Sequence, residues 1–372
     1  MGGKARLEGN MNEIFITYGT MITPLGNSSK ENFNSMLEEK SGVHFVDSSG
    51  FNQESWPLGK INSLPQKNRY NNLLKRACRN LIDTHGTELF SDKKTLVVVS
   101  STKANIEALP EDTFHSTRSI LKEKLKLKNK IVIISNACIS GVIAINTAAD
   151  YLHLEKYDKV VVIGIDALSD FVTYGFQSLF ALSQEPSKPF DKNRKGICIG
   201  EAAGVLIVSK EKINDAFCVN YLGGSSSNDA NHISGPSRTG EGLFRSVNKT
   251  LDRSNVSAKD IDFISAHGTG TNYNDEMESI AFDRLGLIST PINSLKGYFG
   301  HTLGAAGLIE VISTIKMMEN NTLLKSVGFE ETGTSRGINI LKENKKTDVN
   351  TILKTASGFG GGNASLILKK CL

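Results

Sequence analysis

Residues 131–149 read IVIISNACISGVIAINTAA, and the change of pattern inside this stretch decides the fold. The first four residues are all β-branched, which favours a strand. Small and polar residues follow, and apolar side chains then recur with helical spacing from residue 142 to residue 149. The stretch therefore predicts a strand, a tight turn that contains Cys138, and an apolar helix.

The same alternation continues along the chain. Helical stretches, the first at residues 29–39, separate short β-branched runs. Strands that alternate with helices are typical of α/β proteins, so we expect largely parallel sheets. No Pro-rich or Ser-rich linker interrupts the 372 residues, which favours one compact body. The predicted strands are residues 13–17, 95–100, 130–135, 159–165, 203–208, 262–266, 351–356 and 365–368.

The composition is that of an ordinary globular protein and excludes a disordered, collagenous or coiled-coil chain. The 43 Lys and Arg residues against 39 Asp and Glu leave a formal charge of +4, which is too small to indicate nucleic-acid binding. It suits a transient acidic protein partner. No apolar run reaches the roughly 18 residues of a membrane helix, and no signal peptide opens the chain, so we expect no membrane span.

The cysteines are scattered, and no C-x-x-C pair predicts a zinc site or a redox pair. An odd number of unclustered cysteines fits a reducing cytoplasm. Residues 1–10 (MGGKARLEGN) have no periodicity and precede a second methionine, so they are interpreted as a leader or tag remnant. The five cysteines are Cys78, Cys138, Cys198, Cys218 and Cys371.

A later segment repeats the first pattern. Residues 301–304 (HTLG) open an apolar helix, as residues 138–141 (CISG) do earlier in the chain. Each has a reactive side chain, a glycine three positions later, and then small and aliphatic residues. If the two halves are related by duplication, the two helices face each other about a pseudo-twofold axis. Cys138 and His301 are then brought together.

Cys138 lies at the N-terminus of its predicted helix, where the aligned peptide dipoles stabilise a thiolate. Thiols in such positions have lowered pKa values and act as nucleophiles. The small residues around Cys138 leave room for a carbonyl to approach. The competing interpretation is a buried cysteine that packs as a small hydrophobe. The local pattern alone leaves both interpretations open.

Three further segments place reactive residues among glycines. Each segment also has a purely structural interpretation. The first would contain a histidine that caps a turn, the second a surface lysine beside a packed histidine, and the third would be an ordinary tight hairpin. A buried Lys296 would need a carboxylate, and Glu278 is the candidate. No phosphate-binding glycine motif lies between an early strand and a helix, so nucleotide binding is not expected. The segments are 267–278 (HGTGTNYNDEME), 296–301 (KGYFGH) and 357–363 (SGFGGGN).

Together, one cysteine and two histidines among glycines are the set that carbon–carbon bond formation between thioesters requires. The sulfur accepts an acyl group covalently. Two neutral imidazoles donate Nε2–H to a thioester carbonyl whose oxygen gains charge as an enolate forms. Backbone N–H groups from Cys138 and the glycine loop stabilise the oxyanion at the sulfur.

In this order, the four segments resemble the elongating β-ketoacyl-acyl-carrier-protein synthases, Cys-His-His condensing enzymes of the thiolase superfamily. The resemblance covers nearly the whole chain, including PFDKNRKGICIGEAAGVLIV at residues 189–208. It is specific to this branch, because starter-unit enzymes carry Asn where His301 stands and thiolases use a second late Cys. It implies a thiolase-like α/β fold of two pseudo-duplicated halves, residues 11–210 and 211–372, in α-β-α-β-α layers.

The resemblance also implies roles for individual residues. Cys138 would be the acyl-accepting nucleophile. His267 and His301 would bind the malonyl thioester carbonyl and assist its decarboxylation. Lys296 would pair with Glu278 and hold the histidine network.

Further roles concern the glycine loop and the substrate arm. The N–H groups of Cys138 and Phe359 would form the oxyanion hole, and the Phe359 ring would act as a gate. Thr269 and Thr271 would contact the phosphopantetheine arm of an acyl carrier protein. The resemblance implies no metal and no cofactor beyond that arm, a cytoplasmic location, and a dimer through the central sheet, with itself or with a paralogue.

The implied activity is a decarboxylating Claisen condensation of an enzyme-bound acyl group with malonyl-carrier protein, in a fatty-acid, polyene or polyketide pathway. The alternative is a weakly catalytic, chain-length-type partner subunit of a heterodimer. Three departures concern the acyl pocket: a short segment at 101–130, Ile139 after the nucleophile, and Gly362 in place of Thr. The candidate basic docking residues for the acidic carrier protein are Lys67, Arg69, Lys75, Arg76 and Arg79.

Overall fold

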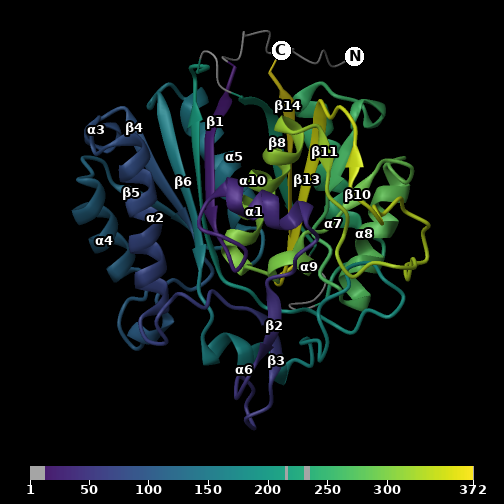
Figure 1. Cartoon of the computed structure of the whole chain (residues 1–372). Helices are drawn as coiled ribbons and strands as arrows, with labels where there is room; N and C mark the ends of the chain where they lie inside the picture. Colours follow the sequence, from purple (N-terminus) through teal and green to yellow (C-terminus); the bar gives the residue numbers. More distant parts are fainter. Residues whose placement is uncertain (1–12, 214–216, 230–234, 372) are drawn as a thin grey trace.

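The computed structural model describes residues 13–213, 217–229 and 235–371, so the predicted leader at residues 1–10 lies outside the described residues. One large sheet crosses the molecule in the order β10-β9-β13-β14-β8-β1-β7-β6-β4-β5 (Figure 1). Its first half contains β1 (Phe15–Ile22), β4 (Thr95–Ser100), β5 (Ile131–Ile134), β6 (Lys159–Asp166) and β7 (Ala202–Ser209). Its second half contains β8 (Val219–Asn228), β9 (Phe263–Ser265), β10 (Ile292–Asn293), β13 (Thr351–Gly358) and β14 (Gly362–Lys370).

The two half-sheets have the same topology. In the first, β4 runs parallel to β5 and β6, and β7 runs antiparallel to β6 and β1. In the second, β9 runs parallel to β10 and β13, and β14 runs antiparallel to β13 and β8. Two residue pairs between β1 and β8, Phe15 with Asn220 and Ile16 with Val219, join the halves. The repeated strand order confirms the internal duplication, while the limits 11–210 and 211–372 stay predictions.

The expectation of largely parallel sheets is wrong. Among the described strands of the large sheet, five pairings are antiparallel and four are parallel. The reason is that β7 and β14 each return beside the strand that precedes them in the chain. The return from β13 to β14 is the tight hairpin at residues 358–362.

Helices cover the half-sheets in layers. The inner layer contains α1 (Ser29–Leu37), α5 (Ser140–His153) and α10 (Ala306–Glu319), while α2 (Arg69–His85) with α4 (His115–Leu125) and α7 (Glu241–Ser254) with α8 (Asn272–Arg284) form the two outer layers (Figure 1). Alternate side chains of β4 face the two kinds of layer. Leu96 and Val98 pack on the inner helices, and Val97 and Val99 pack on the outer helices. The α-β-α-β-α layering predicted for the fold is confirmed.

The inner helices α5 and α10 approach each other through two glycines. A Cβ on Gly141 would lie 2.7 Å from the backbone N of Leu308, and a Cβ on Gly307 would lie 2.8 Å from the backbone N of Val142. Any side chain at either position would therefore push the helices apart. This contact is the face-to-face packing that the repeated motif predicts, and it brings the N-terminal ends of both helices to one place.

Shorter elements surround this frame. They are β2 (Val43–Val46), β3 (Trp56–Gly59), α3 (Glu88–Ser91), η1 (Ile106–Ala108), α6 (Asp170–Ser178), η2 (Ala258–Asp260), α9 (Lys296–Phe299), η3 (Leu303–Ala305), β11 (Thr322–Leu323) and β12 (Lys345–Lys346). The short segment 101–130 contains only η1 and α4. None of the described helices combines the length and apolar character that crossing a membrane requires.

Candidate active site

Cys138 lies in the turn between β5 and α5. The Ser140 hydroxyl closes this turn, because its Oγ accepts from the backbone N–H of Asn136 (2.8 Å) and donates to the carbonyl of Ala137 (2.7 Å). Ala137 adopts a φ of +43°, a left-handed conformation that costs a non-glycine residue about 1–2 kcal/mol. The strained turn sets the position of Cys138, which is 8% exposed.

His267 follows β9 and is held from both sides of its backbone. The N–H groups of His267 and Gly268 donate to the two carboxylate oxygens of Glu278 at 2.8 and 2.6 Å. The carbonyl of His267 accepts from the ammonium of Lys296, and Lys296 Nζ lies 3.2 Å from His267 Nδ1. A lysine ammonium only donates, so Nδ1 is the acceptor and the ring proton lies on Nε2.

His301 lies between α9 and η3 and has the same tautomer. Its backbone N–H donates to the carbonyl of Cys198 (2.7 Å), and its own carbonyl accepts from Gly200 (2.9 Å). The ring Nδ1 accepts from the backbone N–H of Leu303 at 3.2 Å, so Nε2 carries the hydrogen. Among the described residues, this buried Nε2 has no hydrogen-bond partner.

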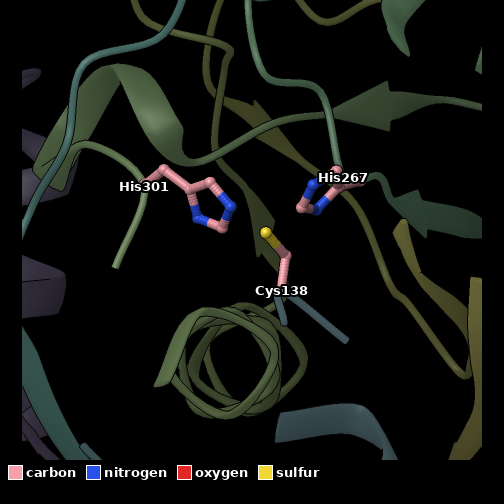
Figure 2. A group of neighbouring side chains, drawn as sticks. All are labelled: Cys138, His267 and His301. Carbon is pink, nitrogen blue, oxygen red and sulfur yellow. The ribbon is translucent and has the colours of Figure 1, made fainter. Parts of the chain in front are cut away.

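The sulfur and the two imidazoles meet, as the sequence predicts. Figure 2 shows Cys138 at the end of its turn with the two rings above it. One ligand-type atom from each side chain lies within 4.8 Å of the others, and the histidine rings are 5.1 Å apart at 82°. The three residues line one cavity of about 330 Å³, together with Thr269, Thr271, Phe176 and Phe359.

Electrostatics keep the resting site uncharged at these three side chains. Burial raises the pKa of the Cys138 thiol to about 11, although Lys296 and the backbone N–H of Phe359 act in the opposite direction. The lowered pKa expected from the helix N-terminus is therefore wrong, because desolvation outweighs it. Burial, and then Lys296, hold the pKa values of His267 and His301 well below the usual range. Both rings are neutral donors.

The predicted ion pair between Lys296 and Glu278 is also wrong. Lys296 Nζ instead lies 2.7 Å from Oε1 of Glu310, a residue of α10. Glu278 faces the end of β9, where its oxygens accept from backbone N–H groups and from Asn274 (2.9 Å). Burial, and then Asp275, raise the pKa of Glu278 to about 7.

Sequence reasoning missed two buried charges, Glu310 and Lys354. Glu310 is 1% exposed, Lys354 is completely buried, and their charged atoms lie 2.6 Å apart. The sequence contains a signal for both residues, because each is the one charged residue in an otherwise uncharged stretch: GLIEVIS at residues 307–313 and TILKTAS at residues 351–357. Lone charges in buried elements are paired, because an unpaired buried charge is costly.

The glycine loop brings Phe359 to the sulfur. It is the hairpin between β13 and β14, with Gly360 and Gly361 at φ of +84° and +77°. The backbone N–H groups of Phe359 and of Cys138 itself act to lower the pKa of the thiol, against the effect of burial. The Phe359 ring is 40% exposed and stacks on Phe176 of α6 at 5.6 Å. The glycine loop is therefore a tight hairpin, and it also lies beside the nucleophile Cys138.

Thr269 and Thr271 lie on the cavity wall, beside His267. Their hydroxyl groups are 2.8 Å apart, and the Thr271 side chain caps α8 by accepting from the N–H of Asn274. Their contact with a phosphopantetheine arm stays a prediction.

The basic residues singled out for docking are not equivalent. Arg69 is 5% exposed and forms a buried ion pair with Glu201, with Nε and Oε2 3.0 Å apart, so it is not a surface charge. Arg76 donates to the Ser63 hydroxyl at 2.8 Å. The remaining three are exposed on or beside α2: Lys67, Lys75 and Arg79.

Comparison with known proteins identifies the family. The β-ketoacyl synthase N-terminal domain matches residues 91–213, and the C-terminal domain matches residues 219–330. A 3-oxoacyl-[acyl-carrier-protein] synthase 2 of Rhizobium meliloti is 32% identical over 266 residues, which are 67% of this chain and 62% of the relative. A 3-oxoacyl-[acyl-carrier-protein] synthase 1 of Buchnera aphidicola is 27% identical over 417 residues, 97% of this chain and all of the relative.

A solved structure extends the likeness to the whole fold. A ketosynthase in complex with its chain length factor, from Xenorhabdus doucetiae, superposes with a TM-score of 0.84 at 25% identity and covers both chains completely. The N-terminal and C-terminal domain matches follow one another as the two half-sheets do, and together they show that this chain belongs to the β-ketoacyl synthase family of acyltransferases.

Proposed function

We propose that this protein is a β-ketoacyl-acyl-carrier-protein synthase that extends an acyl chain by a decarboxylating Claisen condensation, with Cys138 as the nucleophile. The observation that carries the proposal is the convergence, in one buried cavity, of the Cys138 thiol with two imidazole Nε2–H donors. Its relatives named as 3-oxoacyl-[acyl-carrier-protein] synthases support the same reaction.

The first half-reaction is acyl transfer. Cys138 Sγ attacks the carbonyl of an acyl thioester, the bond from that carbonyl to the carrier-protein sulfur breaks, and the thiol proton passes to the leaving sulfur. The N–H groups of Cys138 and Phe359 are the proposed oxyanion hole, and their lowering effect on the pKa of the thiol supports this role.

The second half-reaction uses the histidines. The malonyl thioester loses CO₂, and its electron pair forms an enolate whose oxygen accepts hydrogen bonds from Nε2 of His267 and His301. The enolate carbon attacks the acyl-Cys138 carbonyl and expels the Cys138 thiolate, which then takes a proton from solvent. Neutral imidazoles suit this role, because donors fixed in a dry site stabilise developing negative charge without reorganisation.

The partners follow from the same chemistry. We propose an acyl carrier protein as the carrier of both thioesters, with its phosphopantetheine arm entering past Thr269 and Thr271, and with no metal or other cofactor taking part. The exposed Lys67, Lys75 and Arg79 are the proposed contacts for its acidic surface. The scattered, odd-numbered cysteines support a cytoplasmic location.

A dimer is proposed through the edge of the large sheet. β5 is the last strand on its side, and its four residues, Ile131, Val132, Ile133 and Ile134, are all apolar and only partly buried. An apolar edge strand of this kind is a template for pairing with a second sheet. The partner is a second copy of this chain or a paralogue.

A heterodimer in which this chain is the weakly catalytic subunit is the second candidate. It is favoured by the Xenorhabdus doucetiae structure, in which a ketosynthase is complexed with a chain length factor. The complete set of thiol and two imidazoles favours the catalytic role for this chain.

The test is the intact mass of the purified protein after incubation with a panel of acyl-carrier-protein thioesters. We expect the mass of one acyl group to be added to the wild type and not to Cys138→Ser. Addition of malonyl-carrier protein should then remove the adduct and yield a β-ketoacyl product. An adduct that persists in Cys138→Ser, or none with any acyl chain, contradicts the proposed function.

A further inference from the structure

Lys354 is a buried cation for which the mechanism above has no role. It lies in β13, its side chain is completely buried, and it points toward the inner helix α10. Its ammonium donates to the carbonyl oxygens of Ser265 and Ala266, both at 3.1 Å, and lies 2.6 Å from Oε2 of Glu310. The two carbonyls accept hydrogen bonds from the ammonium, and the Glu310 carboxylate forms its ion pair.

Lys296 complements this arrangement from the other side. Its ammonium contacts the carbonyl and Nδ1 of His267 and Oε1 of Glu310. Two lysines thus share one carboxylate and together bind three consecutive carbonyls, those of Ser265, Ala266 and His267. These carbonyls belong to the end of β9, from which the His267 ring projects toward the cavity.

The charges do not balance within this group. Lys296 and Lys354 are two cations against the single Glu310 anion, and all three side chains are buried. The other ionisable groups of the surrounding elements include Asp275 and Glu278 of α8, Tyr298 of α9, the two site histidines and Cys138. Burial lowers the pKa of Lys354 itself, while the Glu310 carboxylate beside it acts in the opposite direction. Arg194 lies 3.9 Å from Asp275. An excess of positive charge beside an imidazole disfavours its protonation.

We propose that Lys354 is a positioning residue for the decarboxylating half-reaction: with Glu310 and Lys296 it fixes the strand end that carries His267, and its charge keeps that imidazole in its neutral, donating form. The lowered pKa values of the two histidines agree with this role: Lys354 contributes after burial, Lys296 and His301 for His267, and after burial and Lys296 for His301. Lys354 does not touch the N–H groups of Cys138 and Phe359, so acyl transfer to Cys138 should not depend on it.

The proposal rests on the proposed function, and its test separates the half-reactions. In Lys354→Met we expect the rate of CO₂ release from malonyl-carrier protein to fall by about tenfold to a hundredfold, with the loss in kcat rather than in KM. Acylation of Cys138, followed by intact mass, should keep its wild-type rate. Lys369→Met removes an exposed lysine of the neighbouring strand β14 and is the matched control, with both rates unchanged.

A measurement without substrate tests the charge directly. Histidine NMR should show the titration of His267 moving to higher pH in Lys354→Met and returning toward the wild-type value in Lys354→Arg. If Lys354→Met does not fold, Lys354→Gln takes its place, because its amide can donate to the same carbonyls without the charge, and the titration should still move upward.

Unchanged CO₂ release with unmoved histidine titration would overturn the proposal, as would an equal loss of both half-reactions. Failure of the wild type to accept any acyl group would instead count against the proposed function. The NMR titration would then still decide the role of Lys354.

Discussion

The side chain of Ile139 occupies the space beside Gly362: a Cβ on Gly362 would lie 2.7 Å from Cδ1 of Ile139. Both residues depart from the pattern of the family that the sequence resembles, and the structure shows that the departures are in contact. A larger residue after the nucleophile is accommodated by the missing side chain in the glycine loop. The pair therefore sets the distance between the Cys138 turn and the loop that carries Phe359.

Gly362→Ala is expected to destabilise the protein by about 1–3 kcal/mol, because the added methyl overpacks this contact. It should also slow acylation of Cys138, since the Phe359 N–H moves away. Adding Ile139→Val, which removes only the clashing Cδ1, should restore much of the stability and of the acylation rate, as thermal unfolding and acylation assays would show. Gly337→Ala is the matched control, because a Cβ there meets no atom within 4 Å. Additive effects in the double variant would contradict the coupling.

Alkylation of Cys138 by iodoacetamide is expected to accelerate with pH well beyond neutrality. The reactive form is the thiolate, and a pKa of about 11 means that its fraction rises about tenfold for each pH unit between 7 and 10. Peptide mass spectrometry at each pH would follow Cys138 separately from the other cysteines. A rate that reaches its plateau below pH 9 would show that the helix N-terminus lowers the pKa of the thiol more than burial raises it.

Gly141→Ala is expected to separate α5 from α10, because its Cβ would lie 2.7 Å from the backbone N of Leu308. We expect a loss of about 1–3 kcal/mol in unfolding free energy and a strong loss of condensation, as Cys138 moves relative to His301. Gly175→Ala in α6 is the control for stability. Its Cβ meets nothing within 4 Å, so the same substitution should stabilise that helix by about 0.5–1 kcal/mol. Equal effects at both sites would refute the close-packing argument.

Cys218 and Cys371 form a pair of adjacent thiols, with sulfur atoms 2.8 Å apart and a backbone hydrogen bond from Cys371 N–H to the Cys218 carbonyl. Mild oxidation with diamide should take one hydrogen from each thiol and close an intrachain disulfide. Intact mass should show the loss of two hydrogens, absent in Cys371→Ser, while Cys138 still accepts an acyl group. A free thiol count that diamide leaves unchanged would disprove this pairing.

Much of the site could be predicted because its residues lie next to strong local signals. Cys138 follows the β-branched strand β5, His267 follows the short buried strand β9, and the repeated pattern at the two helix starts predicts that Cys138 meets His301. The strand β8 was missed, because its sequence VNYLGGSSSN has neither alternation nor a β-branched run. Its small residues are required by packing: a Cβ on Gly224 would lie 2.1 Å from the side chain of Asn146 in α5.

The failures concern properties that depend on the assembled fold. Lys296 pairs with Glu310 rather than Glu278 because α9 and α10 meet in space, while Glu278 is taken up by the backbone at the end of β9. The thiol of Cys138 has a raised pKa because it is buried, and burial is contributed by residues from the other half of the chain. Sequence patterns predict which residues are reactive far better than they predict what surrounds them.

The duplication, whose two copies join at β1 and β8, has a consequence for catalysis. The sulfur comes from the first copy of the repeat, and both imidazoles come from the second. Each copy therefore supplies a different part of the catalytic site. Neither copy alone could hold an acyl group and also stabilise an enolate. The condensation reaction is therefore a property of the two copies together, and it depends on the contact that holds them in one body.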